Sequence, residues 1–192
     1  MSLEKIKLDS AIYKTRMRNH LEIKDDILFL INNKSGGERI YDENFDDLDI
    51  SKCDYDTTGF NDKTHPYMPI LRPHLLNELN SIISDMGYTR FSITNIWYQQ
   101  YNTDSIHGWH VHTDCQFSAV YYLELPEDCP KTEFIIPYSQ QEKIEIDIKE
   151  GDIIIFPSYV LHRAPKNLSN KTKTIISWNS NYENDIGNHA YA

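Results

Sequence analysis

The sequence has no hydrophobic run long enough to cross a membrane, and it contains only three cysteines. A transmembrane helix needs roughly 18 consecutive apolar residues, so no membrane span is predicted. Cys53, Cys115 and Cys129 form no CxxC pair, which argues against both a disulfide framework and a thiolate zinc site. The N-terminus shows no signal-peptide pattern, and we therefore expect a cytoplasmic protein.

Positive charge is also scarce, because 19 Lys and Arg stand against 29 Asp and Glu for a formal net charge of −10. Proteins that bind duplex nucleic acid are usually basic, so we expect no such partner. Hydrophobic residues make up 40% and charged residues 25% of the 192, which is ordinary for a soluble globular domain. Neither the composition nor the length indicates an oligomeric state.

Helical patterning is confined to the first part of the chain. A first helix is predicted from the capping-box pattern at Asn19 to about residue 31. A second helix begins near Pro73 and ends before Gly87, with a core-facing stripe of Leu75, Leu76, Leu79, Ile82, Ile83 and Met86. Residues 41–66 are predicted to be an irregular acidic surface.

From residue 88 the pattern changes to short runs rich in β-branched and aromatic residues, separated by turn residues. These runs are residues 88–102, 117–125, 132–137, 143–149, 152–156 and 173–181. Such spacing is typical of a β-sandwich or barrel. We therefore predict a mostly β protein with N-terminal helices. Residues 1–87 would pack on a barrel formed by residues 88–192, as one domain overall.

One short stretch, GWHVHTDC at residues 108–115, places His110, His112 and Asp114 at every second position. Residues two apart in an extended chain share a face, so these side chains are predicted to gather. His162 follows just beyond a predicted buried strand, at the mouth of the barrel. Two histidines and one carboxylate that leave open positions are typical of non-haem Fe(II) oxygenases. The favoured metal ligands are His112, Asp114 and His162, with His110 as the alternative third ligand.

Three segments resemble the 2-oxoglutarate/Fe(II)-dependent oxygenases, within a small bacterial and phage subgroup related to the prolyl hydroxylases. They are WHVHTDCQFSAVYYLELPED, GDIIIFPSYVLHRAPKN and KTIISWN, and they lie within roughly residues 92–181. The resemblance implies a double-stranded β-helix, which is a jelly-roll or cupin-like barrel. It also implies that Fe(II), 2-oxoglutarate and O2 act together at one mouth of this barrel.

The resemblance further implies a buried cation for the distal carboxylate of 2-oxoglutarate. Lys173 fits that position, where the subgroup usually has Arg, and Lys171 is the alternative. Tyr122, which shares an inward face with Ser118 and Val120 while Tyr121 points away, fits a neutral donor to the co-substrate. Tyr101 resembles a second tyrosine that reaches it.

These features predict a dioxygenase that hydroxylates an unidentified peptide or small-molecule substrate and releases succinate and CO2. A prolyl substrate follows from the prolyl-hydroxylase likeness by analogy alone. Two alternatives remain open. One is a cupin-type metal enzyme that does not use 2-oxoglutarate, and the other is a non-catalytic barrel that only binds ligands. A cation at Lys173 would have no purpose in the first.

Overall fold

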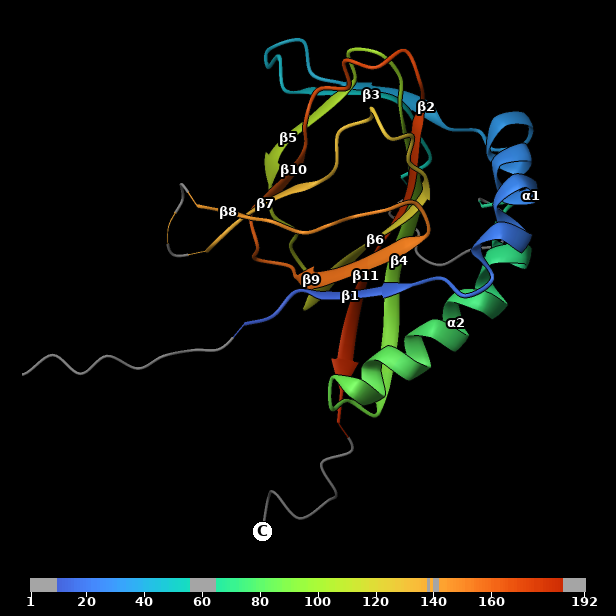
Figure 1. Cartoon of the computed structure of the whole chain (residues 1–192), viewed down its shortest axis with the longest axis vertical. Helices are drawn as coiled ribbons and strands as arrows, with labels where there is room; N and C mark the ends of the chain where they lie inside the picture. Colours follow the sequence, from blue (N-terminus) through green and yellow to red (C-terminus); the bar gives the residue numbers. More distant parts are fainter. Residues whose placement is uncertain (1–9, 56–64, 138, 140–141, 185–192) are drawn as a thin grey trace, which may run out of the picture.

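The computed structural model describes residues 10–55, 65–137, 139 and 142–184, and within them the chain is mostly β (Figure 1). The two helices are α1 (His20–Asn33) and α2 (Met68–Asp85). The strands are β1 (Tyr13–Arg16), β2 (Glu38–Tyr41), β3 (Leu48–Cys53), β4 (Arg90–Tyr101), β5 (Ile106–His110), β6 (Phe117–Glu124), β7 (Glu133–Ile135), β8 (Lys143–Ile144), β9 (Asp152–Pro157), β10 (His162–Ala164) and β11 (Lys173–Glu183). None of the described helices combines the length and apolar character that crossing a bilayer requires.

The strands form one antiparallel sheet that curls into a barrel. The order along the sheet is β1-β9-β6-β11-β4-β3-β5-β10-β7-β8, with β2 paired to β3. Strands that are far apart in the sequence are therefore neighbours, as in β1 with β9 and β11 with β4. This arrangement is the jelly-roll topology that the resemblance implied, and the predicted fold class is confirmed.

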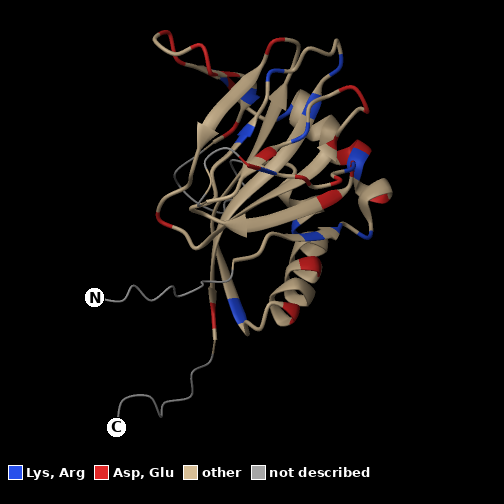
Figure 2. Ribbon diagram, turned by 60° about the vertical axis from the view of Figure 1, so that its left-hand side comes forward, with Lys and Arg blue, Asp and Glu red and all other residues tan. Residues whose placement is uncertain are grey.

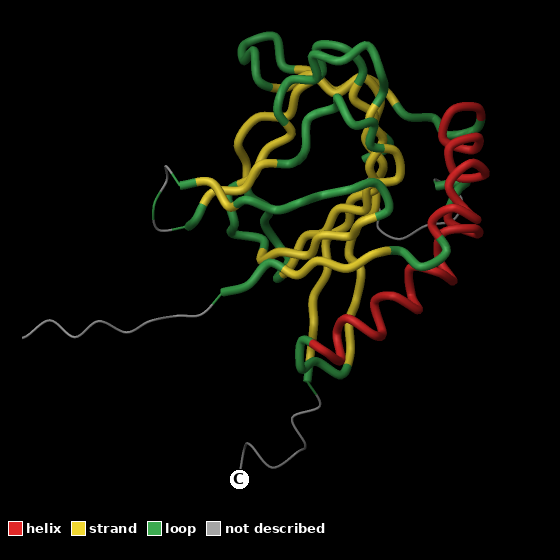
Figure 3. The backbone as a smooth tube through the Cα atoms, viewed as in Figure 1, coloured by secondary structure: helices red, strands yellow, loops and turns green. Residues whose placement is uncertain are grey.

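Both helices cover the outer face of the larger part of the sheet (Figure 3). The predicted stripe of α2 is buried there, since Leu75 and Leu79 have no exposed surface. They belong to one apolar core with Ile27 of α1 and with Tyr121 and Trp178 of the sheet. This core lies between the helices and the sheet.

The opposite face of the same strands lines the barrel interior, because successive side chains of a strand point to opposite faces. On β6, Tyr121 belongs to the helix-facing core, whereas Val120 and Tyr122 belong to a second core inside the barrel. On β11 and β4, Ile175 and Tyr101 also lie inside. The inward and outward faces of β6 are thus the ones that the sequence predicted.

The segment expected to be irregular, residues 41–66, instead supplies β3 to the barrel. This strand pairs with β4 on one side and with β5 on the other. Its inward residues are Leu48, Ile50 and Cys53. The first two are two positions apart, as in a regular strand, but the next is three positions further on. Because this break interrupts the alternation, a simple two-residue period did not identify the strand. Residues 56–64 of the same segment lie outside the described residues.

Lys, Arg, Asp and Glu residues are spread over many of the elements (Figure 2), and an acidic turn joins β2 to β3. This turn contains Asp42, Glu43, Asp46 and Asp47. The backbone N–H of Gly108 on β5 donates to the carbonyl oxygen of Asp47 over 2.6 Å, so the turn is fixed to the strand that carries the first candidate ligand. The hairpin formed by β2 and β3 is therefore part of the barrel mouth.

Candidate metal centre

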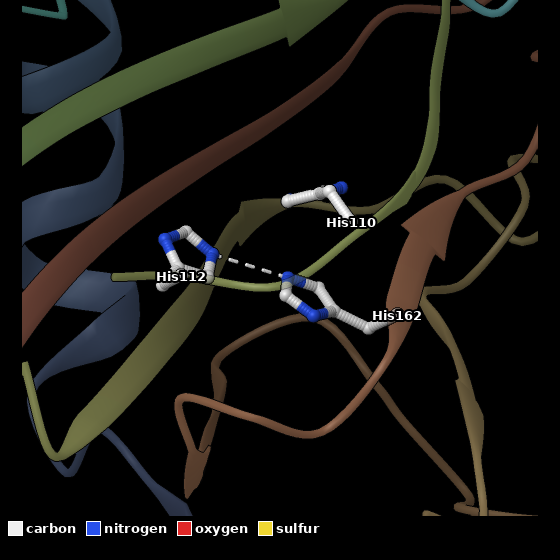
Figure 4. A group of neighbouring side chains, drawn as sticks. All are labelled: His110, His112 and His162. Carbon is white, nitrogen blue, oxygen red and sulfur yellow. Dashed lines mark hydrogen bonds between the residues drawn. The ribbon is translucent and has the colours of Figure 1, made fainter.

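Three histidine side chains converge inside the barrel mouth (Figure 4). His110 ends β5, and His112 follows two residues later. His162 begins β10, which pairs with β5 so that His162 lies opposite His110. One ring nitrogen from each histidine lies within 4.8 Å of the other two. The antiparallel pairing therefore brings together residues that are fifty positions apart.

The histidine rings are oriented by main-chain carbonyls. The Nδ1 of His110 lies 2.8 Å from the Gly108 carbonyl oxygen, and the Nδ1 of His162 lies 2.9 Å from that of Val160. A carbonyl can only accept a hydrogen bond, so each Nδ1 carries the proton and each Nε2 keeps a free lone pair. Metal-binding histidines are commonly held in this way by a hydrogen bond from the second ring nitrogen.

The separation between the two facing rings fits a shared metal ion. The Nε2 atoms of His112 and His162 are 3.2 Å apart. Imidazole nitrogens sit about 2.1 Å from a divalent first-row metal, so two of them at a right angle lie about 3 Å apart. Without a metal one of these nitrogens must carry a proton to complete the pair, whereas a metal uses both lone pairs.

Burial keeps the three rings neutral. It lowers the pKa of His112 to about 4, lowers the pKa of His110, and lowers the pKa of His162 further below its ordinary value. His110 adds to the effect at His112, and both His110 and His112 add to it at His162, because two adjacent imidazolium ions repel. Neutral imidazoles are the form that binds metals, so at pH 7 the site needs no proton release to do so.

Asp114, the carboxylate that the sequence favoured as third ligand, does not lie in this group. Its side chain is exposed, and its backbone φ of 61° is in the left-handed region. The sequence argument assumed an extended chain from residue 110 to 114, but β5 ends at His110 and the alternation stops there. The structure groups His112 and His162 with the alternative ligand His110 instead.

The choice between His110 and Asp114 leads to a first prediction. His110→Phe keeps the ring volume and removes both nitrogens, and we expect it to abolish stoichiometric Co(II) binding, followed by the visible absorption of the bound ion. Asp114→Asn is expected to leave binding unchanged, because that carboxylate lies outside the group. Loss of Co(II) binding in Asp114→Asn together with retention in His110→Phe would reinstate the carboxylate as the ligand.

The three histidines open into a cavity of about 280 Å³ in the barrel interior. At its inner end the cavity is lined by Tyr101, Thr132 and Ile175. Its other walls are mostly apolar and include Ile50 of β3 and Trp97 of β4. A cavity with mostly apolar walls and a few convergent polar groups is the usual form of a small-molecule site.

Lys173 lies against Tyr101, one of the residues that line this cavity. Its side chain has no exposed surface, and its Nζ lies 4.6 Å from the centroid of the Tyr101 ring. The ammonium donates to the Pro130 carbonyl oxygen over 3.0 Å, and no carboxylate among the described residues pairs with it. Burial lowers its pKa to about 8. Lys171, the alternative cation, points outward and pairs with Asp128 over 3.0 Å.

The two candidate tyrosines lie beside this lysine. Tyr101 is opposite Lys173 in the pairing of β4 with β11, and Tyr122 is fully buried on the neighbouring strand β6. The Tyr122 hydroxyl donates to the Thr132 hydroxyl over 2.7 Å, and Thr132 lines the cavity. The hydroxyl groups of Tyr122 and Thr132 and the Lys173 ammonium beside Tyr101 are thus the polar groups available near this part of the cavity lining.

A fourth histidine, His107, was not singled out from the sequence. It stands on β5 three residues before His110, and the two rings stack with their centroids 3.8 Å apart. Burial lowers its pKa to about 3, so it is neutral at pH 7. Residues three apart in a regular strand point to opposite faces, so His107 and His110 were not expected to lie together. The register shift in the pairing of β5 with β10 explains why their rings meet.

No family model and no curated protein matches the sequence. Solved structures do match. An oxidoreductase of the 2OG-Fe(II) oxygenase family from Burkholderia pseudomallei is 16% identical, with a TM-score of 0.66 over 90% of this chain and 88% of that one. A Trichoplax adhaerens prolyl hydroxylase, in complex with a hypoxia inducible factor peptide fragment, is 13% identical, with a TM-score of 0.63 over 91% and 84%.

A third similar structure is the epimerase SnoN in complex with Fe3+, alpha ketoglutarate and nogalamycin RO. It is 9% identical, with a TM-score of 0.64 over 95% of this chain and 88% of that one. At such identities the likeness concerns the fold. The chain therefore has the fold of the 2-oxoglutarate/Fe(II) oxygenases, over most of the length of each of these proteins. The fold that the sequence motifs implied is confirmed.

Proposed function

We propose that this protein is an Fe(II)- and 2-oxoglutarate-dependent dioxygenase whose iron ligands are His110, His112 and His162. The observation that carries the proposal is the pairing of two features in one barrel interior. Three neutral imidazoles converge on one point at the mouth, and a fully buried lysine without a carboxylate partner among the described residues lies at the other end.

An unpaired buried ammonium is costly, and such a group is retained where it meets an anionic ligand. The distal carboxylate of 2-oxoglutarate is an anion of the right kind for Lys173. Tyr101 and the Tyr122–Thr132 hydroxyl pair surround the same place and supply neutral hydrogen-bonding groups. In this proposal they orient the co-substrate, so that its keto-acid end faces the three histidines.

When bound, the ferrous ion activates dioxygen and couples the conversion of 2-oxoglutarate to succinate and CO2 with hydroxylation of a substrate C–H bond. One oxygen atom of O2 enters succinate and the other enters the alcohol product. The chain itself positions the two organic molecules and keeps water away with apolar walls such as Ile50, Val120 and Ile175. These walls also keep the histidines neutral and available to the metal.

The substrate is a peptide or a small molecule in this proposal. Of the similar structures, one is bound to a peptide fragment and another to a nogalamycin compound, so the shared fold accepts both kinds. A prolyl substrate follows from the prolyl hydroxylases among them only as an analogy. We also expect a cytoplasmic location.

The direct test is 2-oxoglutarate turnover by the purified protein with Fe(II), ascorbate and O2, measured as succinate release. We expect slow release without substrate, which requires iron and stops when a chelator is added. Metal binding without any affinity for 2-oxoglutarate would favour the cupin-type alternative. Absence of metal binding would favour a barrel that only binds ligands.

A pH dependence follows from Lys173. Burial lowers its pKa from 10.5 to about 8, so the lysine is charged below pH 8 and becomes neutral above it. Affinity for 2-oxoglutarate is expected to be greatest below pH 8 and to fall by up to about tenfold per pH unit above it. The free energy of unfolding of the ligand-free protein should rise between pH 8 and 10.5, because in that range the unfolded chain binds more protons than the folded one. An affinity that is flat from pH 7 to 10 would count against this pairing.

A further inference from the structure

We propose that the substrate group that enters beside the metal is apolar and uncharged, and that Leu48 and Ile50 of β3 select it. This inference rests on the proposed function and deepens it. Both residues line the cavity, and they come from a hairpin that lies outside residues 92–181, where the family resemblance is found. The selectivity would therefore be a property of this chain.

The wall that these residues form is apolar and held in place. Ile40 of β2 and the edge-to-face pair of Tyr55 and Trp97, with ring centroids 5.0 Å apart, complete it. Leu48 is paired with His107 in the β3–β5 ladder, so its position relative to the histidines is fixed by main-chain hydrogen bonds. A wall fixed in this way can discriminate by shape and polarity.

Among the residues that the structure describes, the polar groups that line the cavity leave no ionised partner for a charged substrate group. Gln99, Thr132 and Ser177 carry no ionisable group. Arg163 also lines the cavity, but its Nε donates to Glu133 over 2.7 Å and its guanidinium lies 4.6 Å from the Trp109 ring centroid.

The two other cations near the cavity are the metal ion and Lys173, and in the proposed function the co-substrate occupies both. The metal binds its keto-acid end, and Lys173 binds its distal carboxylate. A second charged group in the same interior would be desolvated without a partner, which costs several kcal/mol. With both molecules sharing about 280 Å³, the second group must also be small, such as an aliphatic side chain or a terminal alkyl group.

The test uses three capped amino acids of similar length as probes: N-acetylnorleucinamide, N-acetyllysinamide and N-acetylglutamate amide. Binding to the Zn(II)-loaded protein, with and without 2-oxoglutarate, is followed by saturation-transfer NMR and by tryptophan fluorescence, to which Trp97 in the cavity wall contributes. We expect the norleucine probe to bind at least about tenfold more tightly than either charged probe. Equal or tighter binding of a charged probe, or no norleucine binding up to its solubility limit, would overturn the inference.

A variant that exchanges the preference makes the test specific to β3. Leu48 is only half-buried, so Leu48→Glu is compatible with folding, which thermal unfolding verifies. It is expected to weaken norleucine binding and to create affinity for the lysine probe. Leu48→Met should retain the wild-type preference, and Leu168→Glu, at a position 79% exposed outside the cavity, should change nothing. An unchanged preference in Leu48→Glu would show that β3 does not select the substrate.

The outcomes also separate this inference from the proposed function. If succinate release depends on iron and 2-oxoglutarate but the norleucine probe is not preferred, the inference is wrong and the proposed function stands. If the norleucine probe is clearly preferred but the protein neither binds nor turns over 2-oxoglutarate, the proposed function is wrong and the apolar site stands. Stimulation of succinate release by the norleucine probe but not by the lysine probe supports both.

Discussion

Lys173→Met is expected to stabilise the protein and, at the same time, to abolish its affinity for 2-oxoglutarate. Methionine fills nearly the same volume as lysine and carries no charge. A pKa lowered from 10.5 to about 8 means that the buried ammonium costs about 3 kcal/mol at neutral pH. The substitution also loses the hydrogen bond to the Pro130 carbonyl, which reduces the expected stabilisation by about 1 kcal/mol. A net gain of about 2 kcal/mol raises Tm by about 4–8 °C in a domain of this size.

The same substitution removes the charge that would meet the distal carboxylate of the co-substrate. Truncating one partner of a buried charge pair costs about 2–5 kcal/mol of binding, so the affinity for 2-oxoglutarate should fall by at least about thirtyfold. Calorimetric titration of the Zn(II)-loaded protein measures this, and thermal unfolding measures the stability. A stabilised variant that does not bind 2-oxoglutarate is the signature of a charge kept for function.

Two matched variants sharpen the comparison. Lys173→Arg keeps the charge and is expected to retain measurable 2-oxoglutarate binding. Lys171→Met removes the outward-facing cation that pairs with Asp128, and it should alter neither property by much, because exposed ion pairs contribute little. If Lys173→Met bound 2-oxoglutarate as well as the wild type, the lysine would have to be regarded as a structural residue.

His112→Ala is expected to abolish both stoichiometric metal binding and succinate release. The variant keeps two of the three ligand nitrogens. Replacing a residue that is only hydrogen-bonded to a metal ligand already lowers metal affinity by about 10–100-fold. Loss of a ligand should therefore reduce Fe(II) or Co(II) affinity by more than about a hundredfold. Equilibrium dialysis with elemental analysis gives the affinity, and a 2-oxoglutarate decarboxylation assay gives the turnover.

His74→Ala is the control for this substitution, since His74 lies on α2 among the residues that cover the outer face of the sheet. It should bind one metal ion and release succinate like the wild type. His112 is partly exposed at the barrel mouth, so its replacement should leave the fold intact, as circular dichroism will verify. Retained 2-oxoglutarate turnover in His112→Ala would refute the metal centre, whatever the behaviour of the control.

The parts of the molecule with regular patterns were predictable from the sequence. The stripe of α2 follows the helical period closely, so its buried face could be identified, and the alternation on β6 separated Tyr121 from Tyr122 correctly. The spacing of eleven residues from His162 selected Lys173, which is fully buried against the cavity-lining Tyr101, while Lys171 is paired outside. Its role in binding 2-oxoglutarate stays a prediction.

The parts that were not predictable break a regular pattern. Strand β3 was expected to be irregular, because its inward residues change spacing around Ser51 and its pairing partners are distant in sequence. Asp114 was favoured as a ligand on an alternation that ends with β5, and the residue itself has a positive φ; its role as a metal ligand stays a prediction. In both cases a local departure from the strand period decides where the side chains point, and a sequence pattern does not reveal it.

The pairing of β1 with β9 also bears on how the chain is assembled. Tyr13 lies opposite Ile155, so this strand must wait for a partner that is synthesised much later. Until then the apolar faces of the helices that follow it have no sheet to cover. Pairings between such distant residues slow folding and prolong exposure to aggregation. We infer that completion of the barrel, and with it the metal centre, is a late and slow event in the life of each new chain.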